Sequence, residues 1–276
     1  MTAAIDTPTN PATATGPVRR PTTPAGRVRA LGRAEFTLLW RNRTALAIAL
    51  LMPVAMVASF RPLVSTIPLR GTGLDAATLT TSGGIGFVLV FVVYYNLVTT
   101  YVARREELVL KRLRTGEAGD LEILGGAALP AALLALVQCA VLVLSGTLLL
   151  HGGLPRRPDL LLVGVVLGVV LSVALAALST LITRTVEIAQ LTTTPLVLLS
   201  TVGAGLLVPL QSLPHPLAQA CRALPMTPVA ELIQAGLHGG SHAGAGRIAA
   251  DLGLALAWTT VTVFAVRRRF RWEPRR

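Results

Sequence analysis

Six long apolar stretches occupy most of this 276-residue chain, and none of them carries a charged residue in its interior. Most reach the roughly 20 residues that a helix needs to cross about 30 Å of hydrocarbon. A backbone in lipid must satisfy its own hydrogen bonds, so stretches of this length are expected to be helices. We therefore predict an all-α, polytopic membrane protein with six transmembrane helices, at residues 44–60, 83–103, 127–150, 160–183, 188–210 and 252–266.

The basic residues are distributed unevenly between the two sides of the predicted membrane. The chain has 25 basic and 13 acidic residues, and 19 basic residues against 6 fall inside if the N-terminus is cytoplasmic. The positive-inside rule then places both termini in the cytoplasm, which requires an even number of spans. We attribute the basic excess to topology and to anionic lipid headgroups, not to nucleic acid. Arginine supplies 24 of the 25, a bias typical of GC-rich bacterial genomes, so we expect a bacterial membrane protein.

The ends of the chain differ in character from the apolar stretches. Residues 1–26 are rich in Pro, Thr and Ala and are predicted to be a disordered cytoplasmic tail. Residues 27–43 place apolar side chains on one side at helical spacing, which predicts an interfacial amphipathic helix. Glu35 lies among the leucines of that helix, where we expect it to pair with an arginine or to face another protein surface; a simple membrane-surface anchor is the alternative for the helix. Residues 27–270 are expected to form one domain, followed by a basic cytoplasmic tail at 271–276.

The segment 207–250, before the last stretch, has an unusual composition. It contains five prolines and yet many apolar residues. It is too broken by proline for a full span and too apolar for a freely solvated loop. Short re-entrant helices, which enter the outer leaflet and return while packed against protein, satisfy both constraints.

The cytoplasmic segment 104–124 carries both signs of charge. Glu107 and Lys111 stand in the favourable i,i+4 order of a short charged helix. A simple connection between two helices needs only a few residues, so about twenty residues of this kind suggest a docking surface. A solvated loop that only anchors the topology is the alternative.

Several motifs that would give the chain its own energy source or catalytic activity are missing. It has no Gly-x-x-x-x-Gly-Lys-Ser/Thr phosphate loop, so it cannot bind ATP in that way. It has no Asp, Glu, Arg or His inside the six stretches, which weighs against a proton-coupled carrier. It also has no His-Glu-x-x-His zinc motif and no Gly-x-Ser-x-Gly nucleophile elbow. We therefore expect neither catalytic residues nor a metal site.

Aromatic and uncharged polar residues gather in the second and fifth stretches. A lining of this kind suits a hydrophobic or amphipathic solute with few fixed charges. Packing between helices by the same residues is the alternative. The candidate path residues are Phe87, Phe91, Tyr94, Tyr95, Asn96, Thr99, Thr192 and Thr193.

Taken together, these features resemble the permeases of the ABC-2 type transporter family, in particular those of bacterial drug-resistance and polyketide exporters. The resemblance covers about residues 27–270, and the chain departs from the family pattern at Leu108, Gly116 and Gln234. The residues that carry it are Arg105-Glu106-Glu107, Leu113-Arg114-Thr115, Pro209, Leu213-Pro214, Leu224-Pro225 and Glu231.

The resemblance implies a division of labour between subunits. The segment after the second span would be a coupling helix that contacts a separate ABC ATPase. That ATPase would bind ATP and Mg²⁺. Two permease copies would form a dimer around a path lined by the second and fifth spans. The residues placed at the ATPase contact are Arg33, Glu35, Arg105, Glu106, Glu107, Lys111 and Arg112. The resemblance therefore predicts an ATP-driven exporter of a drug, polyketide or lipid-like solute. An ion- or gradient-driven carrier or channel that needs no ATPase is the alternative.

Overall fold

The computed structural model describes residues 75–106, 120–205, 210, 213–239 and 244–269, together with single helical positions between 26 and 62. Every regular element in these ranges is a helix, which confirms the all-α prediction. The second predicted span is one continuous helical run made of α3 (Ala76–Phe87), η1 (Val88–Tyr95) and α4 (Asn96–Glu106). The remaining helices are α6 (Asp120–Leu149), α7 (Pro158–Ser179), α8 (Val186–Gly203), α9 (His215–Arg222), α10 (Thr227–His238) and α11 (Ala245–Arg269).

Among the described residues, four helical runs are long and apolar enough to cross a membrane. They are Ala76–Glu106, Ile123–Leu149, Pro158–Ser179 and Ala245–Arg268, and they correspond to the second, third, fourth and sixth predicted stretches. The fifth stretch forms α8, an 18-residue helix that is not among the four. The chain is therefore a membrane-spanning helical protein, and the count of six spans remains a prediction.

Several helices extend beyond the apolar stretches that predicted them. α3 begins at Ala76, seven residues before the predicted start at position 83. At this N-terminus the Asp75 carboxylate accepts a hydrogen bond from the Thr78 backbone N–H at 3.1 Å. This bond satisfies one of the N–H groups that lack a partner at a helix N-terminus. α11 begins at Ala245, well before position 252, so Arg247 and Asp251 lie within the helix. Apolar length alone underestimates a span because its terminal turns lie in the polar interface.

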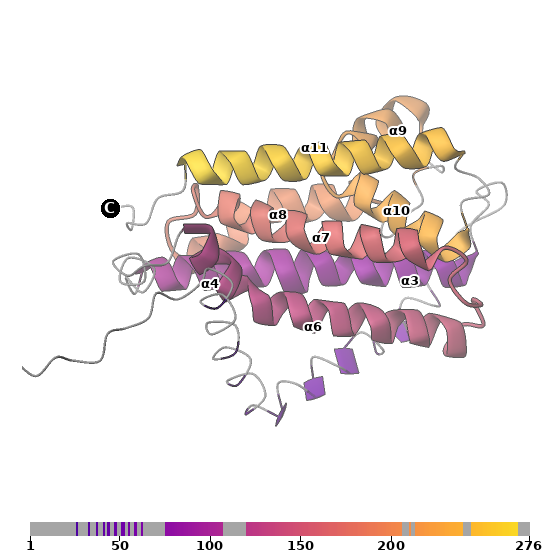
Figure 1. Cartoon of the computed structure of the whole chain (residues 1–276), viewed down its shortest axis with the longest axis horizontal. Helices are drawn as coiled ribbons and strands as arrows, with labels where there is room; N and C mark the ends of the chain where they lie inside the picture. The colour runs from indigo at the N-terminus through magenta and orange to yellow at the C-terminus, as the bar shows by residue number, and fades with distance from the viewer. Residues whose placement is uncertain are drawn as a thin grey trace, which may run out of the picture.

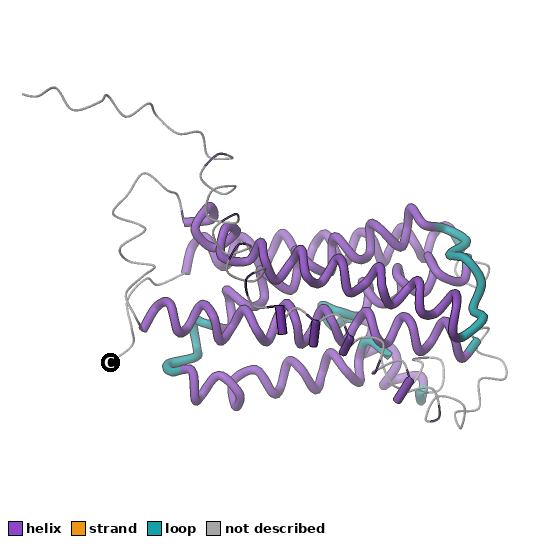
Figure 2. Tube along the Cα trace, turned by 90° about the horizontal axis from the view of Figure 1, so that it is seen from below, coloured by secondary structure: helices purple, strands orange, loops and turns teal. Residues whose placement is uncertain are grey.

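The long helices run side by side along the longest axis of the molecule (Figures 1 and 2). One end of this bundle carries the C-terminus, and α4, α7 and α11 finish there while α6 and α8 begin there (Figure 1). We call it the basic end because the described basic residues of these termini are Arg104, Arg105, Arg184, Arg267, Arg268 and Arg269. The helices α9 and α10 lie toward the opposite end (Figure 1).

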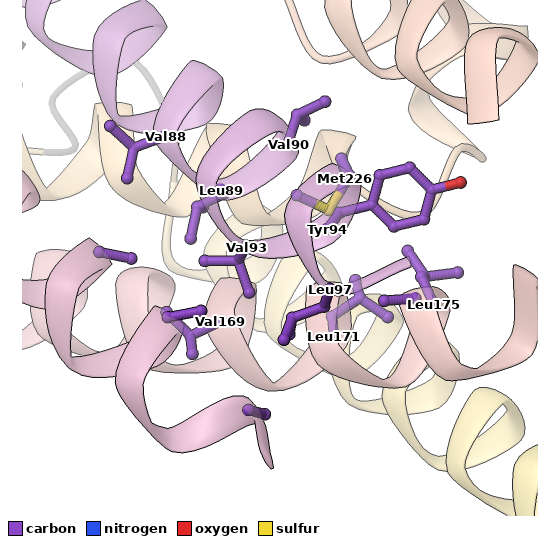
Figure 3. Packing of buried hydrophobic residues seen from close by; sticks show 14 of the residues in the cluster. Val88, Leu89, Val90, Val93, Tyr94, Leu97, Val169, Leu171, Leu175 and Met226 are labelled. Carbon is purple, nitrogen blue, oxygen red and sulfur yellow. The ribbon is translucent and has the colours of Figure 1, made fainter. Parts of the chain in front are cut away.

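The second span lies at the centre of the bundle and α11 at its edge. The rest of the chain buries 72% of the most apolar 18-residue stretch of Ala76–Glu106, but only 11% of the corresponding stretch of Ala245–Arg268. Figure 3 shows Leu89 and Val93 of η1 pointing toward Val169 of α7, and Leu97 of α4 beside Leu171. α11 therefore presents most of its surface to lipid or to another protein.

Glycines allow α10 to lie very close to α7. A β-carbon at position 236 of α10 would lie 2.5 Å from the backbone nitrogen of Leu161. A β-carbon at Gly168 of α7 would lie 2.6 Å from Leu89 and 2.8 Å from Val229, and Gly164 faces Ile233 at 3.0 Å. Gly164 and Gly168 form a Gly-x-x-x-Gly pair, the spacing that permits close helix contact in membranes.

Some predicted segments lie wholly or mainly outside the described residues. They are the tail at 1–26, the basic tail at 271–276, most of the interfacial helix at 27–43 and of the first stretch at 44–60, and residues 107–119 of the cytoplasmic segment. The segment 207–250 does form two short helices, α9 and α10, in its described part. Their re-entry into the membrane remains a prediction.

Candidate transport path and coupling end

The middle of the second span is a π-helix, which is a rare element. Val88–Tyr95 adopts this form for eight residues, between the α-helical segments α3 and α4. A π-helix has i→i+5 hydrogen bonds, occurs mostly as single turns inside α-helices, and is frequent at functional sites. The sequence offers no signal for it, because the run is uniformly apolar and aromatic. Compared with an uninterrupted α-helix, the wider turns rotate every later side chain of the span to a different direction around the helix axis.

An aromatic strip follows this π-helix on its less buried face. The rings of Phe87 and Phe91 stack with centroids 4.0 Å apart, and Tyr95 follows at 6.4 Å from Phe91. These three residues and Thr99 are partly exposed, and Asn96 is exposed. We call Phe87, Phe91, Tyr95, Asn96 and Thr99 the aromatic strip. The structure thus brings five of the eight candidate path residues onto one face.

Tyr94 does not belong to this strip, although it precedes Tyr95 in the chain. Its side chain is 2% exposed, and its hydroxyl lies 3.0 Å from the Ser179 hydroxyl at the end of α7. Figure 3 shows its ring beside Met226 and above Leu175. Tyr94 therefore packs inside the bundle, as the helix-packing alternative proposes for such residues.

The two threonines of the fifth stretch lie on α8, which packs against both η1 and α4. Thr193 is buried and donates to the Ala189 carbonyl of its own helix at 2.7 Å. Thr192 is partly exposed, and its hydroxyl lies 2.7 Å from that of Thr183 in the turn before α8. Helices that carry candidate path residues are thus neighbours, but Thr193 faces the interior.

A separate apolar cavity of about 260 Å³ lies between α6, α7 and α11. Its lining includes Leu124, Ala128, Val169 and Val266, and none of its lining residues is polar. No candidate path residue borders it.

At the basic end, the predicted ATPase-contact residues divide into exposed and buried members. Glu106, the last residue of α4, is exposed, and so is Arg33. Arg105 is only 2% exposed, and its guanidinium donates to carbonyl groups of the α7–α8 turn in the same chain. Glu35, Glu107, Lys111 and Arg112 lie outside the described residues.

A cluster of charges at the opposite end was not predicted from the sequence. The Arg247 guanidinium of α11 lies 3.3 Å from the Glu231 carboxylate of α10 and 4.0 Å from that of Asp251 one turn along α11. The resemblance led us to expect a basic residue shortly after Glu231, where the sequence has Gln234. In the structure Arg247 supplies that cation from the next helix. Arg247 and Asp251 lie in the first two turns of α11, away from the middle of the span.

Comparison with known proteins connects this architecture to a transport family. Residues 26–238 match the ABC-2 type transporter family, whose members form the membrane subunit of ABC transporters and normally pair with an ABC ATPase. That subunit carries out transport and is generally not catalytic. None of the individually curated proteins matches the chain.

Proposed function

Because this chain belongs to the ABC-2 type transporter family, we propose that it is the permease subunit of an ATP-driven exporter. The cargo is a hydrophobic or amphipathic solute, such as a drug, a polyketide or a lipid. ATP and Mg²⁺ are bound by a separate ATPase subunit, and two permease copies form the path. The proposed location is the bacterial inner membrane, with both termini in the cytoplasm.

The aromatic strip is the observation that supports this cargo. Stacked rings at Phe87 and Phe91 offer apolar faces, while Tyr95, Asn96 and Thr99 offer uncharged hydrogen-bonding groups. Sites for small molecules are mostly apolar with a few polar groups that fix the orientation of the ligand. The described residues leave the strip partly exposed, so a second permease copy can close the path over it.

The placement of the coupling segment supports an ATPase as the energy source. α4 ends at Glu106 and α6 begins at Asp120, both at the basic end, and Glu106 is exposed there. We propose that Glu106, Glu107, Lys111 and Arg112 contact the ATPase there, together with Arg33 and Glu35 of the interfacial helix. The ionisable groups described within α11 lie near its ends, where they cannot relay protons through the middle of the membrane.

Reconstitution tests the function directly. The permease and its ATPase are placed together in liposomes, and movement of a fluorescent amphipathic dye and of a fluorescent phospholipid is followed with and without ATP. We expect ATP-dependent movement that is lost when the phosphate-loop lysine of the ATPase is replaced. Movement of either probe by the permease alone, driven by an ion gradient, would refute the proposal and support a carrier or channel.

Adjacent tyrosines provide a test of the strip. Replacing Tyr95 with alanine should change the ratio of transport rates between two dissimilar solutes by roughly 10-fold or more, because losing one contact in an apolar site costs about 1–3 kcal/mol for the solute that uses it. Tyr94→Phe removes only the buried hydroxyl that contacts Ser179 and should leave that ratio unchanged. Rates are measured in the same liposomes at equal protein content. An equal loss for both solutes in Tyr95→Ala would assign Tyr95 to packing.

A further inference from the structure

A buried arginine joins the end of the second span to the turn between α7 and α8. Arg105 lies in the last turn of α4, just before residues 107–119, which we call the coupling segment. Its Nη1 donates to the Thr180 carbonyl at 2.7 Å, and its Nη2 donates to the carbonyl of Thr183 and, at 3.5 Å, to that of Arg184. One guanidinium therefore binds three carbonyl groups of the turn, those of residues 180, 183 and 184.

The acceptors explain why an arginine suits this position. α7 ends at Ser179, and the last carbonyl groups of a helix have no partner within the helix and carry its negative dipole end. A cation placed there is favourable, and a planar fork with five N–H groups can serve several carbonyls at once. A lysine ammonium keeps the charge but lacks the fork. The geometry thus depends on the shape of the group as well as on its charge.

The same turn is also connected to α8. The Thr183 hydroxyl donates to the Ser179 carbonyl at 2.9 Å and lies 2.7 Å from the Thr192 hydroxyl of α8. Thr180 and Thr183 are buried, so water does not replace these bonds. A displacement of the turn is therefore passed to α8 through short polar contacts.

A second bond fixes the other end of the coupling segment to the same helix. One turn before Arg105, the buried Tyr101 hydroxyl donates to the Leu124 carbonyl of α6 at 2.9 Å. The start of α6, which follows residues 107–119 in the chain, is thus bonded to α4, the helix that precedes them. A force applied to this segment reaches α4 from both ends.

We propose that Arg105 is a positioning residue for transport, which transmits movement of the coupling segment to the α7–α8 turn and through it to α8. This inference rests on the proposed function, since it takes the ATPase as the source of the movement. Separating α4 from the turn would leave a buried cation and several carbonyls without partners, which is costly. The turn therefore follows α4 when the ATPase subunits close. In this role the Arg105 guanidinium acts within the permease and not at the ATPase surface.

The test uses the complete permease–ATPase complex in liposomes and compares wild type with Arg105→Lys and Arg105→Gln. Three quantities are measured: co-purification of the ATPase, ATP hydrolysis, and movement of a fluorescent amphipathic dye. We expect both variants to assemble and hydrolyse ATP while the dye moved per ATP falls at least tenfold. Hydrogen exchange in residues 180–192 should respond to a non-hydrolysable ATP analogue in wild type, and this response should be lost in Arg105→Lys. Arg267→Gln removes an exposed cation from the same end of the bundle and should behave as wild type.

The possible outcomes separate the two proposals. A wild-type complex that moves no dye with ATP would refute the proposed function itself. Variants that move as much dye per ATP as wild type would overturn only the role of Arg105. Loss of ATPase association in both variants would assign Arg105 to docking or folding and would overturn that role as well.

Discussion

Replacing Gly236 with alanine is expected to lower the free energy of unfolding by about 1–2 kcal/mol, even though alanine is the better helix former. In a helix interior, alanine is favoured over glycine by about 0.5–1 kcal/mol. Against this, the new β-carbon would lie 2.5 Å from the Leu161 nitrogen and 2.7 Å from its α-carbon. Overpacking of this kind costs about 1–3 kcal/mol, and it falls at the upper end here because backbone atoms cannot rotate away.

The measurement is a denaturation curve of the detergent-solubilised permease, with Gly253→Ala as the matched control. Gly253 lies in α11, and a β-carbon there would meet no atom within 4 Å. The control should be as stable as wild type or slightly more stable, because it gains helix propensity without a clash. Equal stability of both variants would show that α10 and α7 can separate at no cost.

The positions of the spans were largely predictable because burial in lipid constrains sequence strongly. Four of the six apolar stretches correspond to helices long enough to cross a membrane. The close contact of α7 with α10 also had a signal, the Gly164-x-x-x-Gly168 spacing, which apolar length alone does not detect. The ends of α11 were missed because an interfacial turn can hold Arg247 and Asp251 without breaking the helix.

The site was less predictable because it depends on which face of a helix meets a neighbour. Tyr94 and Tyr95 have the same side chain, yet Tyr94 is buried against Ser179 and Tyr95 belongs to the aromatic strip. Adjacent residues of a helix point in different directions, and no residue pattern indicated which of the two faces inward. Similarly, the partner of Glu231 is 16 residues away in sequence and on another helix. Contacts of this kind follow from the packing of several helices and not from local spacing.

Neighbouring residues at the end of α4 illustrate how one motif can serve two purposes. Arg105 turns inward to the α7–α8 turn, and Glu106 is exposed. A helix directs successive side chains about 100° apart, so an Arg-Glu pair can place one side chain inside the bundle and the other on its surface. The motif that supports the family resemblance is thus split between an internal contact and a proposed external one.

Reversing the charge at Glu106 is expected to weaken association with the ATPase by roughly 10- to 100-fold, equivalent to about 1.4–2.8 kcal/mol. The variant Glu106→Lys converts a proposed attractive contact into a like-charge one, and such contacts at an interface are costly. The side chain is exposed, so the substitution should leave folding and membrane insertion intact. Affinity is measured by titrating purified ATPase onto the detergent-solubilised permease at two salt concentrations. The difference from wild type should shrink at the higher concentration, because salt screens exposed charges.

Glu187→Lys is the matched control, since it makes the same charge change on an exposed residue at the basic end but in the first turn of α8. If the coupling segment forms the contact, Glu187→Lys should bind the ATPase nearly as well as wild type. Equal weakening by both variants would mean that the overall charge of this end, and not Glu106 itself, attracts the ATPase. Unchanged affinity in Glu106→Lys would show that Glu106 does not contact the ATPase. Because Arg105 faces inward, neither described residue of this motif would then have a docking role.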